Sequence, residues 1–599
     1  MTNGINTREL ILQILLEIEE EGKHSHIAIR NALSKYQFLP RQERAFITRV
    51  CEGTLEYRIL IDYIIDSYSK VSVDKMKPVI REILRSAVYQ IRFMDSVPDS
   101  AVCNEAVKLA QRKGFYSLKP FVNGVLRTIA REWKNLKLPS REENPVRYLS
   151  VRYSMPETLV NRWLEDYGEE KTEKILTDFL TEKPITVRCR THKYPQKEIY
   201  ESLVDQGVEV KPAPYLPYAY EISNYNHILA LDAFIQGKIQ VQDVSSMLVA
   251  EIADPQKGDY VIDMCAAPGG KSLHVADKMG DYGTVDARDI SQYKVNMIEE
   301  NIHRTDCINV QAHVMDATVF DVDSELKADV VLADVPCSGY GVIGKKPEIK
   351  YRVTAQKQEE IVILQRTILD NAAEYVKPGG VLVFSTCTIA KEENEDVIEW
   401  FLNEYKDMEL IHIDSSFGRE GFIPGVRRIF PMDQGEGHFI AKLQKKSGVD
   451  KKLSCLRSAS LDALVTSFLK DQIEKDKYYF YTNHDKVYLM KRPFIDLKNI
   501  KVLRQGLYVG DIIKKRFEPA HAFYMANCLN YLMAVDVSIE TMDQFMHGLE
   551  IEQETRKGYV ALCYKGINFG FGKSDGKRIK NKIPKGLRLM EGSHVLKED

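Results

Sequence analysis

The spacing of hydrophobic positions over residues 1–138 predicts a region made of helices alone. Apolar residues recur there at intervals of three and four, as at Ile80, Ile83 and Leu84, which is the repeat of an amphipathic helix. The prolines fall between these segments. The first segment, residues 7–17, carries acids among its apolar residues, so we expect a helix and not a signal peptide.

Three further regions follow, each with its own pattern. Residues 139–235 show short β-rich pieces broken by prolines, which predicts a linker and a small α+β subdomain. Residues 236–445 alternate strand and helix patterns, which is typical of a Rossmann-like α/β fold. A charged stretch at 445–452 indicates a linker, and residues 446–599, rich in tyrosine and glycine, predict a small mixed α+β domain. The predicted fold class is therefore multidomain: all-α, then α/β, then α+β.

Length and composition agree with a chain of several ordinary globular domains. A chain of 599 residues is too long for a single hydrophobic core. Its apolar fraction of 44% and charged fraction of 28% are typical of a globular protein that folds in water. No apolar run approaches the roughly 18 residues that span a bilayer. We expect a cytoplasmic monomer that does not associate with membranes.

The ten cysteines are scattered through the chain without any Cys-x-x-Cys pair. This spacing argues against a zinc site and against a secreted disulfide framework. We therefore expect reduced thiols and no bound metal.

Two of the cysteines, Cys337 and Cys387, each follow an apolar, β-branched run. The runs are residues 328–333 and 381–384. In an open α/β sheet, the carboxyl ends of the strands form the edge at which ligands bind. Two thiols and the carboxylate of Asp334 at that edge indicate covalent chemistry on an electron-poor ring rather than a disulfide.

A second feature of the same edge lies at residues 261–272, where a strand pattern leads through a turn of small residues into a helix expected to begin near Ser272. Small residues let the backbone approach a ligand closely, and a helix start offers free N–H groups. A nucleotide phosphate is poorly supported, because neither G-x-G-x-x-G nor G-x-x-x-x-G-K-[ST] is present. S-adenosyl-L-methionine, whose carboxylate and ribose suit the same turn, is the alternative ligand. The predicted cofactor turn consists of Cys265, Ala266, Ala267, Pro268, Gly269, Gly270 and Lys271.

Three aspartates end successive strand patterns: Asp289, Asp316 and Asp334. Asp289 is expected to accept both ribose hydroxyls of the cofactor, and Asp316 to bind the adenine amino group. Each of them alone fits a solvated turn or a helix cap. Three in register on successive strand ends favour a cofactor pocket.

The net charge of −3 hides a basic block at residues 573–588, whose own net charge is +6. A solvated basic tail is one interpretation of such a block. Glycines at 570 and 572 and the neighbouring Phe569 and Phe571 favour RNA binding, in which phosphate contacts combine with aromatic stacking.

Together these motifs resemble the RsmB/Sun family of RNA cytosine-5 methyltransferases. Their order and spacing fit from about residue 145 to 445. Residues 1–138 resemble the NusB-type RNA-binding domain that such enzymes carry in front. The matching pieces are residues 242–246, 263–272, 334–339, 385–388, 392–395 and 437–441, and in the front region residues 89–91, 104–108 and 121–127.

The chain continues beyond residue 445, where chains of the RsmB type are expected to end. The extension, with residues 516–519 and 570–588, resembles the carboxyl-terminal domain of RsmF-type rRNA methyltransferases. In that branch the domain has a PUA-like RNA-binding role. The chain thus resembles a combination of the two accessory domains.

The resemblance implies a role for each site residue. Cys387 is the nucleophile that adds to carbon 6 of cytosine, and Cys337 assists release of the methylated product. Asp334 binds the N3 and amino edge of the base, and Lys271 positions the base or the cofactor. Spacing alone does not choose between the two cysteines. The glutamates within residues 392–395 are expected in the first turn of the following helix, where the helix dipole favours them.

The leading hypothesis is S-adenosyl-L-methionine-dependent methylation of carbon 5 of a specific cytosine in 16S rRNA through a covalent cysteine adduct. A second hypothesis of the same class is cytosine-5 methylation of another rRNA site or of a tRNA. A third, of a different class, is a non-catalytic RNA-binding or antitermination factor. In each case the expected partner is RNA, which must present the target base outside its stack if the protein is an enzyme.

Overall fold

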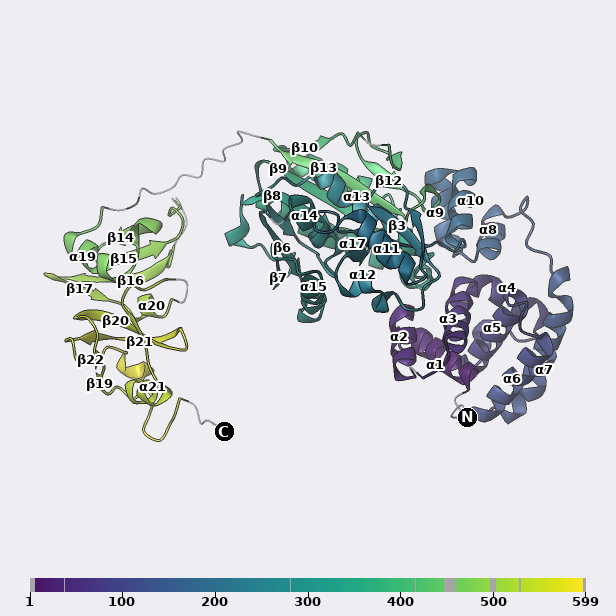
Figure 1. Cartoon of the computed structure of the whole chain (residues 1–599), viewed down its shortest axis with the longest axis horizontal. Coiled ribbons are helices and arrows are strands. Elements are labelled where there is room, and N and C mark those ends of the chain that lie inside the picture. Colours follow the sequence, from purple (N-terminus) through teal and green to yellow (C-terminus); the bar gives the residue numbers. More distant parts are fainter. Residues whose placement is uncertain are drawn as a thin grey trace. The chain divides into compact units, whose positions relative to one another are not determined.

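The chain divides into two compact units, residues 1–449 and 450–599 (Figure 1). The computed structural model describes residues 6–36, 38–280, 282–414, 416–446, 458, 460–495, 502–526 and 529–595. The linker predicted at 445–452 lies, from residue 447 onward, outside the described residues.

Helices alone form the front of the first unit, as the apolar spacing predicts. Helix α5 has the most buried residues of the set, and its Tyr89 is fully buried against Gly53 of α3. A Cβ atom at Gly53 would lie 2.1 Å from the Tyr89 ring, so this close packing requires glycine. The helices are α1 (Thr7–Glu20), α2 (Ser25–Lys35), α3 (Arg41–Glu56), α4 (Arg58–Tyr68), α5 (Pro78–Phe93), α6 (Asp99–Arg112) and α7 (Lys119–Glu132).

Three more helices follow where the sequence pattern indicated β-rich pieces. They are α8 (Pro145–Tyr153), α9 (Glu157–Tyr167) and α10 (Glu169–Phe179). The prediction was wrong here because Pro145 and Pro156 lie at the starts of α8 and α9, where proline suits a helix, rather than breaking strands. Trp163 of α9 is fully buried and packs edge-on against Tyr340, in the loop that follows Cys337.

The small subdomain between these helices and the large sheet is a four-stranded antiparallel sheet of order β2-β3-β1-β4. Its helix α11 (Gln196–Asp205) contributes Ile199 and Leu203 to a small core with the sheet. The strands are β1 (Ile185–Cys189), β2 (Glu209–Pro212), β3 (Ala219–Ser223) and β4 (Ile239–Val241).

The large sheet has the order β11-β12-β13-β9-β8-β5-β6-β7, with β10 also paired to β13. The five strands from β9 to β7 are parallel, and β13 runs antiparallel to β9. The order reverses between β5 and β8, which is where α/β sheets bind ligands. The strands are β5 (Tyr260–Asp263), β6 (Thr284–Asp289), β7 (Val310–Val314), β8 (Ala328–Asp334), β9 (Val376–Thr386), β10 (Met408–Ile411), β11 (Arg419–Glu420), β12 (Arg427–Ile429) and β13 (His438–Lys445).

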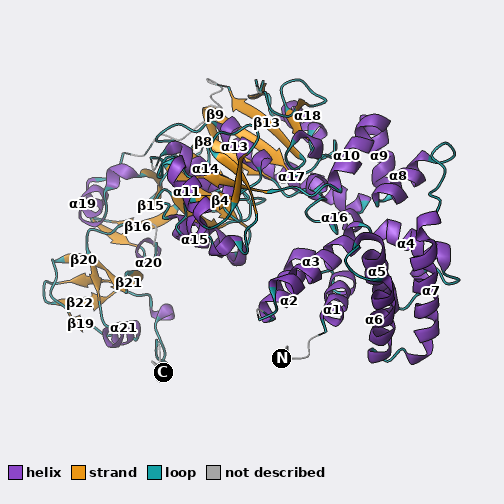
Figure 2. Cartoon of the chain, turned by 45° about the vertical axis from the view of Figure 1, so that its right-hand side comes forward, coloured by secondary structure: helices purple, strands orange, loops and turns teal. Residues whose placement is uncertain are grey.

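Helices cover both faces of this sheet (Figure 2). Neighbouring residues of β8 point to opposite faces, so that Val330 joins one core and Val331 the other. One face packs on α13 (Val244–Ala253), α14 (Gly270–Met279) and α15 (Gln292–Thr305), and the other on α17 (Ala355–Tyr375) and α18 (Glu395–Glu404). The predicted Rossmann-like α/β fold is confirmed.

The front helices contact the part of the chain that carries the large sheet through a short segment around α16 (Ile349–Arg352). Glu348 is 2% exposed and accepts hydrogen bonds from Ser25 N (3.1 Å) and Ser25 Oγ (2.8 Å) at the start of α2. Lys350 is 4% exposed, and its Nζ donates to the backbone oxygen of Glu56 (2.7 Å) at the end of α3. The segment therefore binds the ends of two front helices through buried polar groups.

The second unit contains two sheets. One has the order β14-β15-β16-β17, and the other β18-β20-β21-β22-β19. Their strands are β14 (Tyr479–Asn483), β15 (Lys486–Met490), β16 (Leu507–Ile513), β17 (Arg516–Pro519), β18 (Ala534–Asp536), β19 (Ile551–Glu552), β20 (Gly558–Tyr564), β21 (Ile567–Ser574) and β22 (Arg578–Asn581), and the helices are α19 (Ala463–Gln472), α20 (His521–Tyr524) and α21 (Ile539–Met546).

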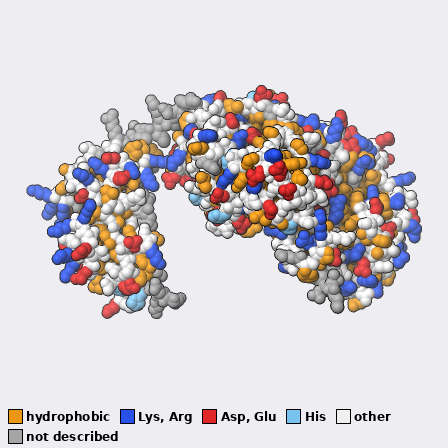
Figure 3. Space-filling view, in the orientation of Figure 1, with side chains coloured by type: hydrophobic (Ala, Val, Ile, Leu, Met, Phe, Trp, Pro, Cys, Tyr) orange, Lys and Arg blue, Asp and Glu red, His pale blue; other side chains and the backbone are white. Residues whose placement is uncertain are grey.

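The basic block is built into this second sheet. Lys573 lies on β21, and Arg578 and Lys580 on β22, with their side chains exposed, and lysine and arginine side chains line one edge of this unit in Figure 3. A solvated tail is therefore the wrong interpretation of residues 573–588. The pairing of two strands fixes the basic side chains on a rigid support.

The aromatic part of that prediction was also wrong. Phe569 and Phe571 are 8% and 4% exposed, and the Phe571 ring stacks on Tyr524 with centroids 4.5 Å apart. Gly572 is required by packing, because a Cβ there would lie 2.3 Å from Ile579. These residues form the core beneath the basic strands, so they are not available to stack on bases.

Candidate active site

The predicted cofactor turn joins β5 to α14 at the carboxyl edge of the sheet. Gly269 precedes the helix with φ +99°, a conformation that side chains disfavour, and a Cβ there would lie 3.2 Å from Ile298. Helix α14 begins at Gly270 without a side-chain cap. The turn is held by Asp289, whose Oδ2 accepts a hydrogen bond from Ala267 N (3.0 Å). The helix start thus presents backbone N–H groups to the edge of the sheet.

The three predicted aspartates lie at this edge. Asp289 is buried at the end of β6, where it also accepts from Ile290 N (2.8 Å) and pairs with Lys294 (3.0 Å). Asp316 follows β7 by two residues, and hydrogen bonds from Thr318 hold its pKa below the ordinary value. Asp334 is the last residue of β8.

A fourth aspartate, Asp263, ends β5 between them. Its side chain is 1% exposed, and burial raises its pKa to about 7 although Ser272 Oγ donates to Oδ2 (2.6 Å). Among the described residues, nothing donates a hydrogen bond to its Oδ1. A buried acceptor without a donor is costly, so this atom fits a site that a donor group of a ligand completes. The residues at the edge therefore fit a polar cofactor such as S-adenosyl-L-methionine.

Lys271 and Asp334 form an ion pair beside the turn, with Nζ and Oδ2 2.7 Å apart. Ser385 Oγ donates to the other oxygen of Asp334 (2.7 Å). Burial alone would raise the pKa of Asp334, but the Lys271 ammonium and the Ser385 hydroxyl outweigh it and keep the pKa below the ordinary value. The same pair raises the pKa of Lys271 against the effect of its own burial. Asp334 is therefore a carboxylate, and Lys271 an ammonium, at neutral pH.

The two predicted cysteines lie together just beyond β8 and β9, with their sulfur atoms 3.3 Å apart. Both are free thiols, because a disulfide would bring the sulfurs to about 2.05 Å. The contact with Cys387 and burial raise the pKa of Cys337, and the nearby Glu393 carboxylate adds to the effect. Cys337 is therefore held in its protonated form at neutral pH.

Hydrogen bonds fix the two cysteine loops to each other. Ser338 Oγ and Thr388 Oγ1 are 2.7 Å apart, and Gly341 N donates to the backbone oxygen of Cys387 (2.9 Å). Gly341 also packs against the backbone of Gly437, where a Cβ would lie 2.0 Å from the Gly437 oxygen. The sulfur positions thus depend on backbone contacts that leave no room for side chains at these two glycines.

The prediction for the glutamates of residues 392–395 was only partly right. Glu395 is the first residue of α18, but it is fully buried and pairs with Arg428 of β12. Glu393 precedes the helix and accepts hydrogen bonds from Ser338 N (2.7 Å) and Gln358 Nε2 (3.0 Å). It therefore points at the Cys337 loop, because a backbone donor there outweighs the attraction of the helix dipole.

Sequence reasoning did not select Asp263, Ser385 or His438 as site residues. Asp263 ends a strand pattern, as the three selected aspartates do, so the same signal could have found it. Ser385 lies one residue inside the carboxyl end of β9, and His438 is the first residue of β13. His438 comes into the site only through the antiparallel pairing of β13 with β9, which the sequence pattern does not specify.

His438 is expected to stay neutral down to about pH 4. It is 4% exposed, and burial together with the nearby Lys271 ammonium lowers its pKa to about 4. In the unfolded chain the histidine side chain takes up a proton near pH 6.5. Protonation of the unfolded chain therefore does not reduce the free energy of unfolding above that pH, and it reduces it progressively as the pH falls toward 4. When the pH is lowered from 7 to 4.5, the free energy of unfolding should decrease in both proteins. The decrease should be about 2 to 3 kcal/mol smaller in the His438→Gln variant than in the unaltered protein. Urea unfolding at the two pH values measures this, and equal losses in both proteins would contradict it.

Two classes of feature were not found. Within the described residues no three His, Cys, Asp or Glu side chains are grouped as metal ligands would be. In the same part of the chain, no helix has the length and apolar character needed to cross a bilayer.

Comparison with known families defines the class of this site. The family model described as 16S rRNA methyltransferase RsmB/F matches residues 250–444, which contain the sheet, the turn and both thiols. The fold and the site are those of an S-adenosyl-L-methionine-dependent methyltransferase. The other matching models are NusB (residues 5–131), the ferredoxin-like domain of RsmF/B-like methyltransferases (155–228), the first C-terminal domain of RsmF (467–526) and the RsmF PUA domain (533–589).

Individual proteins extend this likeness over most of the chain. A probable ribosomal RNA small subunit methyltransferase B of Bacillus subtilis is 34% identical over 452 residues, which are 74% of this chain and 99% of that protein. Its counterpart in Synechocystis is 31% identical, covering 74% and 100%. The crystal structure of PH0851 is 30% identical with a TM-score of 0.64, covering 74% of this chain and 99% of that one. The chain belongs to the RsmB/F family of 16S rRNA methyltransferases, and the predicted NusB-like front and RsmF-like extension are confirmed.

Proposed function

We propose that this protein methylates carbon 5 of a specific cytosine in 16S rRNA through a covalent cysteine adduct. The observation that carries the proposal is the pair of thiols 3.3 Å apart, next to the Lys271–Asp334 ion pair at the ligand-binding edge of the sheet. The names of the relatives, which are rRNA small subunit methyltransferases, support the choice of substrate.

The cofactor is held, in this proposal, by the turn from Cys265 to Gly270 and by Asp289 and Asp316. The backbone N–H groups at the start of α14 suit a carboxylate, and Asp289 suits ribose hydroxyls. Asp263 adds a buried acceptor for a donor of the ligand. When bound, S-adenosyl-L-methionine supplies a methyl group on a positively charged sulfur and is converted to S-adenosyl-homocysteine.

Cys387 is the nucleophile in the proposed reaction. Its sulfur forms a bond to carbon 6 of the cytosine, which makes carbon 5 electron-rich enough to take the methyl group. A base then removes the proton from carbon 5, and the bond between sulfur and carbon 6 breaks to restore the ring and the thiolate. The contact between the two sulfur atoms supports a division of roles, because one thiol can stay protonated and assist while the other acts as the nucleophile. The family resemblance assigns the nucleophile to Cys387.

The remaining residues position the base and assist its release. Asp334 is a carboxylate and accepts a hydrogen bond from the cytosine amino group, while Lys271 holds that carboxylate in place. Cys337, as a neutral thiol in contact with Cys387, stabilises the departing thiolate by donating a hydrogen bond to it. The target base must leave its stack to reach these groups, so unpaired or remodelled RNA is the expected substrate.

Mapping of the product tests the proposal. We expect 16S rRNA transcribed in vitro to acquire one 5-methylcytidine on incubation with the protein and S-adenosyl-L-methionine, detected by bisulfite sequencing and by mass spectrometry of nucleosides. A methyl group found on another atom, or on tRNA in place of 16S rRNA, would overturn the substrate assignment. No transfer to any RNA would favour a non-catalytic RNA-binding role.

A further inference from the structure

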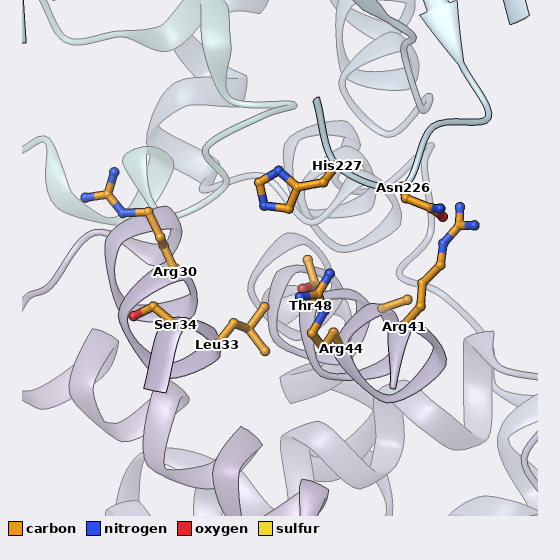
Figure 4. Close-up of a pocket in the computed structure, with 9 residues that line it drawn as sticks. Arg30, Leu33, Ser34, Arg41, Arg44, Thr48, Asn226 and His227 are labelled. Carbon is orange, nitrogen blue, oxygen red and sulfur yellow. The ribbon is translucent and has the colours of Figure 1, made fainter. Parts of the chain in front are cut away.

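A separate cavity of about 650 Å³ lies between the front helices and the small subdomain (Figure 4). None of its lining residues belongs to the site described above. Helices α2 and α3 supply Arg30, Arg41 and Arg44 from one wall. The loop after β3 supplies Asn226 and His227 from the opposite wall, and Figure 4 shows these two side chains facing the helices across the space.

The cavity carries uncompensated positive charge. Its lining contains three arginines and no aspartate or glutamate. Other arginines of the front helices form ion pairs, for example Arg58 with Glu19 (2.8 Å) and Arg85 with Asp62 (2.7 Å). In the described part of the chain no carboxylate lies within ion-pair distance of the three cavity arginines, and the hydrogen bond of Arg41 goes to a backbone oxygen, that of Tyr225 (3.4 Å). The guanidinium groups are therefore free to bind an anion from solution.

We infer that this cavity binds the sugar-phosphate backbone of the RNA substrate, an inference that rests on the proposed function. Arginine forks match phosphate oxygens, and phosphate contacts supply most of the affinity of RNA-binding proteins. Ser34, Thr48 and Asn226 add uncharged hydrogen-bonding groups, which suit ribose hydroxyls and phosphates. An acidic protein bound in the cavity would also pair with the arginines, but it would form fewer hydrogen bonds with these uncharged groups.

Both walls of the cavity are tied to the active site. The helix wall, at the end of α3, binds the segment that follows Cys337 through Glu56 and Lys350. The opposite wall belongs to the subdomain whose Arg188 and Arg190 pair with Asp277 of α14, the helix that carries Lys271. RNA held between the walls is thereby fixed relative to the residues that receive the base.

The Arg30→Gln, Arg44→Gln double variant tests the inference while keeping the bond of Arg41 to the loop. We expect its Kd for 16S rRNA to rise about tenfold at 0.1 M salt, and the slope of log Kd against log salt to fall by about 1.4, because each phosphate contact to unpaired RNA contributes roughly 0.7. The kcat at saturating RNA and the Kd for S-adenosyl-L-methionine should not change. Filter binding, single-turnover methylation and calorimetry measure these quantities.

The matched control is the Arg112→Gln, Arg127→Gln double variant, which removes the same charge from exposed positions of α6 and α7. Its RNA affinity and salt slope should stay close to those of the unaltered protein. If both double variants weakened RNA binding equally, the inference would be overturned, because the loss would then depend on the net charge of the protein and not on the cavity. Unchanged RNA binding in the cavity variant, with reduced binding of an acidic protein, would overturn it in favour of a protein partner.

A second variant acts from the opposite wall. Asn226→Asp places a negative charge in the cavity without changing the shape of the side chain, and we expect it to weaken RNA binding as well. An RNA affinity unchanged in both cavity variants, with normal methylation by the unaltered protein, refutes the cavity inference alone. No 5-methylcytidine formed by the unaltered protein refutes the proposed function instead.

Discussion

Replacing Cys387 with alanine is expected to reduce methylation of 16S rRNA at least about 10³-fold, a loss of roughly 4 kcal/mol or more of transition-state stabilisation. Without a sulfur on carbon 6, carbon 5 of cytosine is too weak a nucleophile to take the methyl group. Alanine keeps the backbone oxygen that binds Gly341 N, so the two loops should remain in place. Transfer of tritium from labelled S-adenosyl-L-methionine measures the loss, and calorimetry should show unchanged cofactor affinity.

The Cys337→Ala variant should behave differently, because Cys337 is assigned to product release. We expect an RNA–protein adduct that survives denaturation and migrates as a slow band on a denaturing gel. Cys103→Ala, at a buried cysteine of α6, is the control and should methylate normally without a stable adduct. Full methylation by Cys387→Ala, together with no adduct from Cys337→Ala, would show that the two roles are wrongly assigned.

Replacing Asp277 with asparagine should destabilise the first unit by about 3 to 5 kcal/mol, which for a unit of this size corresponds to a fall in Tm of about 3 to 5 °C. Asp277 is buried on α14 and pairs with Arg188 and Arg190 of the subdomain, which are 1% and 0% exposed. Asparagine would leave two buried guanidinium groups without a counter-charge. Calorimetric melting at pH 7 measures the change, and we expect weaker cofactor binding because α14 begins at the cofactor turn.

The stabilisation that Asp277 provides depends on pH, because only the ionised carboxylate pairs with the arginines. Burial would raise the pKa of Asp277, but the two arginines outweigh it and lower the pKa. Its stabilisation is thus complete above the unfolded pKa of about 3.9 and is lost as the pH falls through the lower, folded pKa. Asp306→Asn removes an exposed carboxylate that pairs with Lys193, and as the control it should leave the melting temperature nearly unchanged. Equal melting of Asp277→Asn and the unaltered protein would mean that the buried pair contributes nothing.

The sheet edge could be predicted because each of its signals is local. Cys337 and Cys387 each follow an apolar run within a few residues, and Asp289 and Asp334 each end a strand pattern. A strand followed at once by a reactive side chain places that side chain at the ligand-binding edge, whichever strands pair. The strand order, and with it the 3.3 Å contact of the sulfurs, depends on pairing that the runs themselves do not encode.

The features that escaped prediction join residues far apart in the chain. Asp277 meets Arg188 across 89 positions, and Ser25 meets Glu348 across 323. Phe571 illustrates a different limit, since an aromatic residue beside a basic block can face either the solvent or the core. Only the folded structure shows that Phe571 is buried while Lys573, two residues further along the same strand, is exposed.

The contact between the segment around Lys350 and the front helices indicates that the front region cannot be removed without affecting the rest of the chain. The NusB-like region matches a family of its own, yet its helix ends satisfy Glu348 and Lys350, which are nearly inaccessible to water. Cutting the chain after residue 138 would strip both groups of their partners and uncover a charged surface directly beyond the Cys337 loop. The front region is in this respect a structural part of the enzyme, because its helix ends bury the polar groups of the segment beyond the Cys337 loop.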